Sequence, residues 1–193
     1  MQLLRSIGWL VSLVLSTVPS YWFLVHPWAE YWRRKHGARF RLLGPLWMAM
    51  WIAVGLLTRP WRHVLLYDAR WPWIPGGLLL ATGFYLYSRA HLSFDQLIGR
   101  PEVQGEGQRL VTTGIHAYIR HPVYLGHLCE LLGWSAGTGL AVIYALTAFA
   151  VITGAIMIRM EERELEQRFG DAYRDYKARV RVFPGVGRIG ETS

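Results

Sequence analysis

Apolar segments separated by short basic loops dominate this sequence, and they restrict it to a helical fold. The first runs from Ile7 to Val25 and is long enough to cross a bilayer about 30 Å thick. The others are Leu42–Thr58, Trp71–Tyr87, Pro122–Trp134 and Thr138–Ile158. A backbone in lipid must pair its own N–H and C=O groups, and an α-helix does so within one segment. The pattern therefore predicts an all-α polytopic membrane protein with about five transmembrane helices.

The last two apolar segments are predicted to form a C-terminal helical hairpin. Pro122–Trp134 is short, and the sequence SAGTG at Ser135–Gly139 interrupts the helical pattern before the longer segment begins. A partner helix can shield the ends of a short membrane helix, so neither arm has to span the bilayer alone. The first segment also follows a basic residue, as in a signal peptide, but Thr17–Ser20 is a poor cleavage site and the apolar run continues past it.

A charged amphipathic helix is predicted to begin at Arg159, on the cytosolic side. Apolar side chains recur there at spacings of three and four and give one stripe: Leu165, Phe169, Tyr173 and Tyr176. Gly170 is expected to interrupt this helix, and Asp171 is expected to cap the next one.

The chain is predicted to be one integral membrane domain, residues 1–193. Three membrane helices (1–88) are followed by a cytosolic loop (89–121), the hairpin (122–158), and cytosolic C-terminal helices and tail (159–193). With the C-terminus inside, only four of the 21 lysines and arginines fall outside: Arg5, Arg59, Arg62 and Arg70. The positive-inside rule thus predicts an N-out, C-in topology. The expected location is a bacterial-type inner (plasma) membrane.

Charge and cysteine content exclude several other classes of protein. The formal net charge is +8, but the basic residues occur in short clusters between apolar segments, which suits an anionic membrane surface better than nucleic acid. The single cysteine, Cys129, rules out an intrachain disulfide. The seven histidines show no metal-binding spacing, so no metal site is predicted.

The segment Arg120-His121-Pro122-Val123-Tyr124 joins a polar stretch to an apolar one. Proline in the first helical turn leaves free N–H groups at the positive end of the helix dipole, which favours an anion. Arg120 adds a planar donor suited to a carboxylate, and Tyr124 adds a hydroxyl. An interfacial anchor of Arg, His and Tyr explains the same residues.

Acidic residues follow the last apolar segment. Glu161 and Glu162 lie so close to the apolar boundary that a buried or ligand-facing role is plausible, whereas Glu164 and Glu166 fit a solvated helix face. Within the fourth apolar segment, His127 and Glu130 are further candidates, because ionisable groups in a membrane helix are often functional.

Two long motifs resemble a known family. LVTTGIHAYIRHPVYLG (Leu110–Gly126) follows the pattern LVxxGxYxxxRHPxYxG, with His116 in place of the usual tyrosine. EERELEQRFGDAYRDYKARV (Glu161–Val180) follows EExxLxxxFGxxYxxY in full. The chain resembles the isoprenylcysteine carboxyl methyltransferases, their bacterial relatives and the phospholipid N-methyltransferases over about residues 105–184.

The resemblance implies a membrane methyltransferase that uses S-adenosyl-L-methionine and takes a lipophilic acceptor from the bilayer. The residues it implies for the cofactor site are Gln108, Leu110, Val111, His116, Arg120, His121, Pro122, Tyr124, Glu161 and Glu162. Among these, His121, Pro122 and Tyr124 would contact the amino acid moiety, with Arg120 in support. Glu162 is also a candidate catalytic residue, together with Arg159, which would approach the acceptor.

The sequence leaves the acceptor group open among carboxylate, thiol and amine, and it says nothing about oligomeric state. A membrane sterol or enone reductase that uses NADPH is an alternative enzyme, since such enzymes also resemble this C-terminal region. A small membrane scaffold, with the polar motifs as anchors, is the non-enzymatic alternative. Methyl transfer from a sulfonium depends mainly on alignment, so the lack of an evident catalytic dyad fits the first hypothesis.

Overall fold

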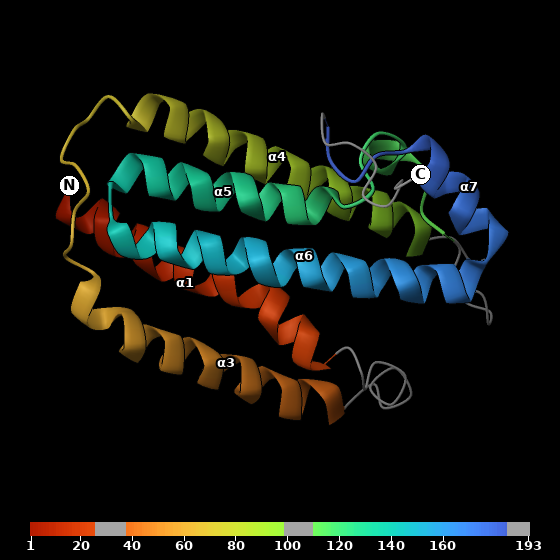
Figure 1. Cartoon of the computed structure of the whole chain (residues 1–193), viewed down its shortest axis with the longest axis horizontal. Helices are drawn as coiled ribbons and strands as arrows, with labels where there is room; N and C mark the ends of the chain where they lie inside the picture. The colour runs from red at the N-terminus through yellow and green to blue at the C-terminus, as the bar shows by residue number, and fades with distance from the viewer. Residues whose placement is uncertain (26–37, 99–109, 185–193) are drawn as a thin grey trace, which may run out of the picture. The chain divides into compact units, whose positions relative to one another are not determined.

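The computed structural model describes residues 1–25, 38–98 and 110–184 (Figure 1). Over these residues the chain is helical, as the sequence predicts, and β-pairing is limited to two isolated bridges. The elements in order are α1 (Gln2–Val25), α3 (Ala38–Thr58), the 3₁₀ turn η2 (Arg59–Trp61), α4 (Trp73–Ile98), the 3₁₀ turn η4 (Gly114–Ala117), α5 (Pro122–Thr138), α6 (Ala141–Phe169) and α7 (Asp171–Arg179).

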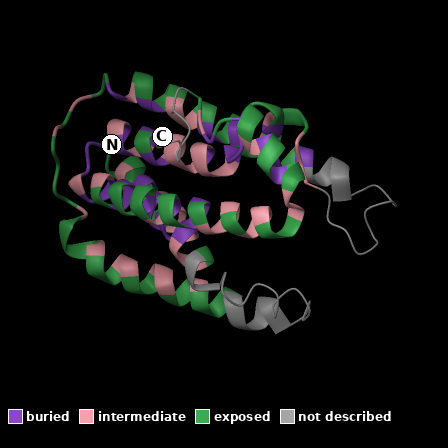
Figure 2. Cartoon of the chain, turned by 45° about the vertical axis from the view of Figure 1, so that its right-hand side comes forward, coloured by how far each residue is buried: buried purple, intermediate pink, exposed green. Residues whose placement is uncertain are grey.

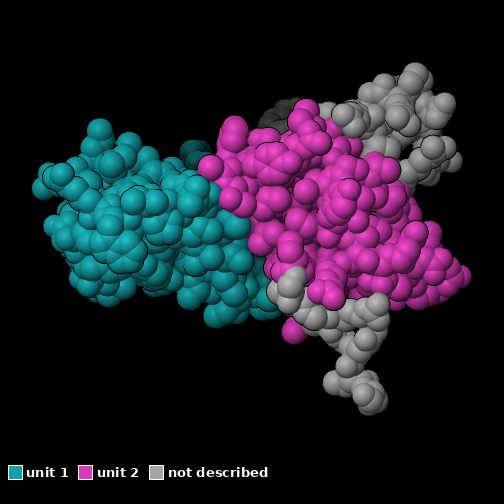
Figure 3. All heavy atoms as spheres, turned by 90° about the horizontal axis from the view of Figure 1, so that it is seen from above, with its two compact units in different colours: residues 1–80, 128–157 teal, residues 81–127, 158–193 magenta. Residues whose placement is uncertain are grey.

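The chain divides into two compact units (Figure 3). Unit 1 contains residues 1–80 and 128–157, and unit 2 contains residues 81–127 and 158–193. The boundaries fall inside α4, α5 and α6, so each of these helices contributes to both units. All the described residues of the predicted cofactor site belong to unit 2.

Helices α1 and α3 pack together in unit 1. Two tryptophans of this pair donate hydrogen bonds to threonine hydroxyls: Trp9 to Thr58 at 3.1 Å, and Trp47 to Thr17 at 3.2 Å. Buried polar groups are stable only when they are paired, so these bonds fix how the two helices face each other. None of the described residues of α3 is buried (Figure 2), and its exposed surface is apolar, as lipid requires.

Among the described residues, two helices, α1 and α6, are long and apolar enough to cross a membrane. The prediction of about five spans goes further than this finding. Several exposed side chains of α3, α4 and α6 are large and apolar, including Leu57, Phe84 and Ile152. Such a surface is costly in water and favourable in lipid.

The turn between α5 and α6 lies later than the sequence suggested. The prediction that Ser135–Gly139 breaks the helix is wrong, because α5 continues to Thr138 and only Gly139 and Leu140 separate it from α6. Gly139 adopts a positive φ of 68°, which suits glycine, and its carbonyl accepts a hydrogen bond from the N–H of Leu66 at 2.8 Å. Across this turn, the hydroxyls of Ser135 and Thr147 are 3.1 Å apart and hydrogen-bonded.

Two other helices are also longer than predicted. α4 was expected to end near Tyr87, but it continues to Ile98 into the segment read as a loop. α6 runs without a break through Arg159, where a separate amphipathic helix was expected to begin. Helical hydrogen bonding continues across a change from apolar to charged side chains, because the backbone pairs in the same way on both sides.

Glycines allow α4 and α5 to approach closely in unit 1. A Cβ atom at Gly76 would lie 2.8 Å from the carbonyl oxygen of Gly133, and one at Gly133 would lie 2.8 Å from the carbonyl oxygen of Gly76. Small residues at such contacts are typical of membrane helices, where van der Waals packing drives association. A Cβ atom at Gly77, the next residue of α4, would have no such neighbour within 4 Å.

Replacing Gly76 with alanine is therefore expected to destabilise the protein by about 1–3 kcal/mol, since the added methyl group collides with backbone that cannot move aside cheaply. Gly77→Ala adds the same group to the same helix without a contact, and it should leave stability unchanged or slightly raised. The measurement is thermal denaturation in detergent. Equal melting temperatures for the two variants would contradict the close contact.

Candidate functional site

Helix α7 is held in unit 2 by an apolar cluster. Tyr173, Tyr176 and Val180 form its buried part, and Leu110, Leu165 and Phe169 pack against them. The predicted stripe of apolar residues is therefore confirmed as one cluster, although it comes from two helices. Gly170, with φ of 53°, separates α6 from α7 as expected.

Asp171 does not cap α7, contrary to the prediction. It is the first residue of the helix, Gly170 occupies the cap position without a side-chain hydrogen bond, and the carboxylate of Asp171 pairs with Arg174 instead. A residue inside the first turn can still favour the helix through its charge at the positive end of the dipole.

The 3₁₀ turn η4 places His116 against α7. The hydroxyl of Tyr176 donates a hydrogen bond of 2.7 Å to the carbonyl oxygen of His116. The His116 side chain is buried, and burial together with the charge of His121 lowers its pKa to about 4. His116 is therefore neutral at pH 7. Burial likewise raises the pKa of Tyr176 to about 12, so its phenol remains a donor.

Arg120 is buried and every arm of its guanidinium is engaged. Nε donates to Oε1 of Glu162 at 3.0 Å, and Nη2 lies 2.8 Å from the same oxygen. Nη1 donates to the carbonyl oxygens of Lys177 at 3.0 Å and Val180 at 2.5 Å. Arg120 thus joins α6 to the C-terminal end of α7, where unpaired carbonyls favour a cation.

Glu162 is the centre of a cluster of basic side chains. Besides Arg120, Nε2 of His121 lies 3.3 Å from Oε1, and Nζ of Lys177 lies 3.4 Å from Oε2. The side chain of Glu162 is only 12% exposed. Both of its oxygens therefore face cations of the protein itself, and the buried charge is compensated.

Glu161 differs from its neighbour in exposure and in partners. Its side chain is 37% exposed, and Oε2 lies 3.8 Å from Nδ1 of His121. The Tyr124 hydroxyl is within hydrogen-bonding reach of the same carboxylate. The rings of His121 and Tyr124 are 5.8 Å apart and nearly perpendicular. Glu161 is thus a partly exposed carboxylate beside the first turn of α5.

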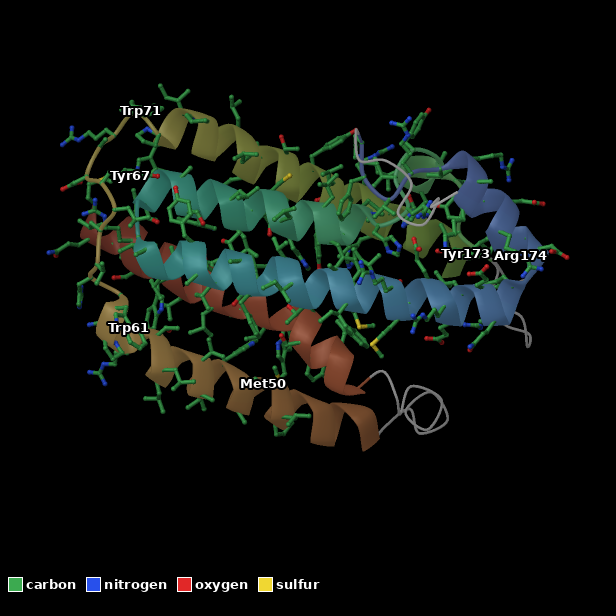
Figure 4. All side chains as sticks on the ribbon, viewed as in Figure 1. Met50, Trp61, Tyr67, Trp71, Tyr173 and Arg174 are labelled. Atoms are coloured by element: carbon green, nitrogen blue, oxygen red, sulfur yellow. The ribbon has the colours of Figure 1, made fainter. Side chains whose placement is uncertain are left out.

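Tyr173 adds a buried hydroxyl to this group. The residue is 1% exposed, and its oxygen has no hydrogen-bond partner among the residues that the structure describes. Burial raises the pKa of Tyr173, and the nearby charge of Glu162 raises it further. In Figure 4, Tyr173 and Arg174 occupy adjacent positions of α7, and only Tyr173 is buried.

The structure brings together part of the predicted site. Arg120, His121, Tyr124, Glu161 and Glu162 form one connected group. Pro122 begins α5 as expected and is buried. Leu110 and Val111 are half-buried, and Leu110 packs on the α7 cluster.

Arg159, His127 and Glu130 are not part of this group. Arg159 is exposed, and it forms no ion pair or hydrogen bond with the residues that the structure describes. Gln108 lies outside the described residues. The ring of His127 packs 5.5 Å from that of Tyr87, and Glu130 is half-buried.

Sequence reasoning missed the contribution of α7 to the charged group. Lys177 gave no signal beyond its spacing of four from Tyr173. The other contacts are made by the main-chain carbonyls of Lys177, Val180 and Arg181, and a contact to the main chain cannot be predicted from the type of side chain. The carbonyl of Arg181 accepts a hydrogen bond from the N–H of Arg120 at 3.0 Å. This contact holds the segment after α7 beside the RHP motif.

Comparison with known proteins identifies relatives of this region. The model of the phospholipid methyltransferase family matches residues 73–172, just over half of the chain. Methanethiol S-methyltransferase 1 of Bradyrhizobium diazoefficiens is 30% identical over 112 residues, covering 58% of this chain and 37% of the relative. The mouse protein-S-isoprenylcysteine O-methyltransferase is 39% identical over 80 residues, covering 37% and 25%.

A reductase is also among the relatives. The mouse delta(14)-sterol reductase is 31% identical over 125 residues, covering 56% of this chain and 29% of the relative. The aligned parts thus span about a quarter to two fifths of these three relatives. No solved structure matches the chain. The family match includes the RHP motif and the paired glutamates, so the chain belongs to the phospholipid methyltransferase family.

Proposed function

We propose that this protein is a membrane methyltransferase that uses S-adenosyl-L-methionine and methylates a lipophilic acceptor. The observation that carries the proposal is the accessible carboxylate of Glu161 at the first turn of α5, inside the motifs of the family. Two relatives are named for methyl transfer to a thiol and to a carboxyl group, which supports a thiol or carboxylate acceptor.

The residues present fit the charges of this cofactor. Its amino acid moiety has a carboxylate and an ammonium, and its sulfur is cationic. The first N–H groups of α5 have no partner within the helix, and they suit the carboxylate. Glu161 suits the ammonium or the sulfonium, because its carboxylate is accessible while that of Glu162 is taken up by Arg120, His121 and Lys177.

Arg120 and Glu162 act in this proposal as positioning residues. Their buried contacts hold α6, α7 and the start of α5 in one arrangement, so that Glu161 and His121 have fixed places. The cofactor supplies an already activated methyl group, and alignment of donor with acceptor provides most of the rate enhancement. A thiolate or carboxylate acceptor then needs no general base.

The acceptor and the membrane placement belong to the same proposal. Arg159 is exposed and is a candidate to approach an anionic acceptor. The predicted N-out, C-in topology with about five spans is supported by the distribution of lysine and arginine, and it puts the RHP motif and Glu161 at the cytoplasmic face.

The test is methyl transfer by the purified protein in lipid nanodiscs. Labelled S-adenosyl-L-methionine should yield a product that partitions into organic solvent, with a small thiol, a prenylcysteine or a phospholipid amine offered separately. S-adenosylhomocysteine should bind saturably and should not be displaced by NADPH. Displacement by NADPH, together with its oxidation in the presence of a sterol and no methyl transfer, would instead establish the reductase.

A further inference from the structure

Unit 1 contains a cavity of about 440 Å³, and none of the residues that line it belongs to the candidate cofactor site. Its cationic wall contains Arg5 and Arg62, Ser6 adds a hydroxyl, and Trp9, Leu65 and Leu140 supply apolar surface. None of its lining residues is acidic. The volume lies within the range of ordinary ligand pockets.

Arg5 is held in place at the cavity. Nε donates to the carbonyl oxygen of Thr138 at 3.2 Å, and Nη2 pairs with Asp68 at 2.6 Å. Its side chain is 16% exposed, whereas that of Asp68 is 68% exposed. Asp68 does not line the cavity, but its carboxylate anchors Arg5 and compensates part of its charge.

Arg62 has more donors available. Its Nε donates to Nε2 of His63 at 3.0 Å, and its guanidinium carbon lies 5.8 Å from the centroid of the Trp9 ring. The Trp9 ring is itself fixed by the hydrogen bond to Thr58. Within the described part of the chain, no hydrogen bond or ion pair is found for Nη1 or Nη2 of Arg62. These nitrogens form a planar fork suited to an oxyanion.

We propose that this cavity binds a phosphate group, supplied by the headgroup of an anionic lipid or by free phosphate. Two guanidinium groups and a hydroxyl match the oxygens of a phosphate. Arg5 is paired with Asp68, whereas no lining carboxylate compensates the charge of Arg62. Trp9, Leu65 and Leu140 offer apolar contact to the glycerol and first methylene groups of a lipid.

The experiment is calorimetric titration of the full chain in neutral detergent with dihexanoyl-phosphatidic acid. Arg62→Gln is expected to weaken binding about tenfold or more, because it removes charge-assisted hydrogen bonds. Arg70→Gln removes the same charge from the same segment, but Arg70 does not line the cavity, and its effect should stay within about twofold. Equal loss in both variants would overturn the proposal.

A second variant tests the cavity without removing a contact. Ser6 is exposed in the first turns of α1, where a glutamate is compatible with the helix dipole, so Ser6→Glu should fold normally. Its carboxylate is expected to abolish phosphatidic acid binding by repulsion. Unchanged affinity in Ser6→Glu, or equally tight binding of uncharged dihexanoylglycerol by the wild type, would contradict a phosphate site.

Competition with inorganic phosphate distinguishes the two sources. Displacement of the lipid by phosphate alone supports a site that recognises the free ion, and binding of the lipid without displacement supports a headgroup site. Cofactor binding is measured on the same samples. Because the cavity shares no residue with the candidate cofactor site, the failure of either proposal leaves the other intact.

Discussion

Replacement of Arg120 with alanine is expected to release α7 from unit 2 and to cost about 3–5 kcal/mol of stability. The guanidinium donates to the carbonyls of Lys177 and Val180 at the end of α7 and pairs with the buried carboxylate of Glu162. Alanine leaves those carbonyls without their donor, and it leaves the buried charge of Glu162 with fewer positive partners. Such a variant should also lose cofactor binding, because Glu161 then lacks a fixed place.

Hydrogen–deuterium exchange locates the effect. Amides of α7 and of the segment around His116 should exchange faster in Arg120→Ala, while those of α1 should not change. Arg174→Ala is the matched control: it also removes an arginine paired with an acidic residue, but on the exposed face of α7, and it should leave exchange unaltered. Arg120→Lys should restore little, since an ammonium cannot serve Glu162 and two carbonyls with the geometry of a guanidinium. Wild-type protection of α7 in Arg120→Ala would refute this account.

Much of the architecture could be predicted from residue patterns. The apolar segments indicate helices because lipid leaves the backbone few alternatives. Each predicted segment is mostly helical in the structure, although Trp71–Pro72 precede α4 and Gly139–Leu140 form the turn between α5 and α6. The spacing of Leu165, Phe169, Tyr173 and Tyr176 indicates a shared face, and these side chains do pack together. The motifs identify Arg120 and His121, which lie beside Glu162, but they give no indication of Lys177.

Helix ends could not be predicted in the same way. The apolar pattern stops at Tyr87 and Ile158, but the hydrogen bonds of α4 and α6 continue beyond both. The sequence SAGTG looks like a break, yet small residues allow α5 to lie against α4 and remain helical to Thr138. The polarity of a side chain reflects its environment, whereas the end of a helix depends on where its backbone hydrogen bonds end.

The different roles of adjacent charged residues could not be predicted from the sequence either. Glu161 and Glu162 are consecutive, so their side chains leave α6 about 100° apart around its axis. Only the folded position of α7 decides which carboxylate is enclosed by Arg120, His121 and Lys177. Likewise, the amino-acid sequence does not show that Arg120 donates hydrogen bonds to main-chain carbonyls.

Glu161→Gln is expected to weaken cofactor binding about 10–100-fold with little change in melting temperature, as loss of one charge-assisted contact implies. The side chain of Glu161 is 37% exposed and its only ion pair among the described residues, with His121, is long at 3.8 Å, so it can meet a cationic ligand at little structural cost. Glu162→Gln should lower the melting temperature instead, because it removes the charge that compensates Arg120 and Lys177.

Glu166→Gln is the matched control for Glu161→Gln. Its side chain has the same 37% exposure and lies 3.9 Å from Lys177, but it belongs to the face that pairs with α7. Its effect on cofactor affinity should therefore be within about twofold. Titration with both S-adenosyl-L-methionine and S-adenosylhomocysteine then identifies the group that Glu161 meets. A larger loss for the sulfonium form places the carboxylate beside the sulfur, and equal losses place it beside the ammonium that both ligands share. If Glu161→Gln binds both ligands as tightly as the wild type, Glu161 does not contact the cofactor, and the proposed arrangement of the site is wrong.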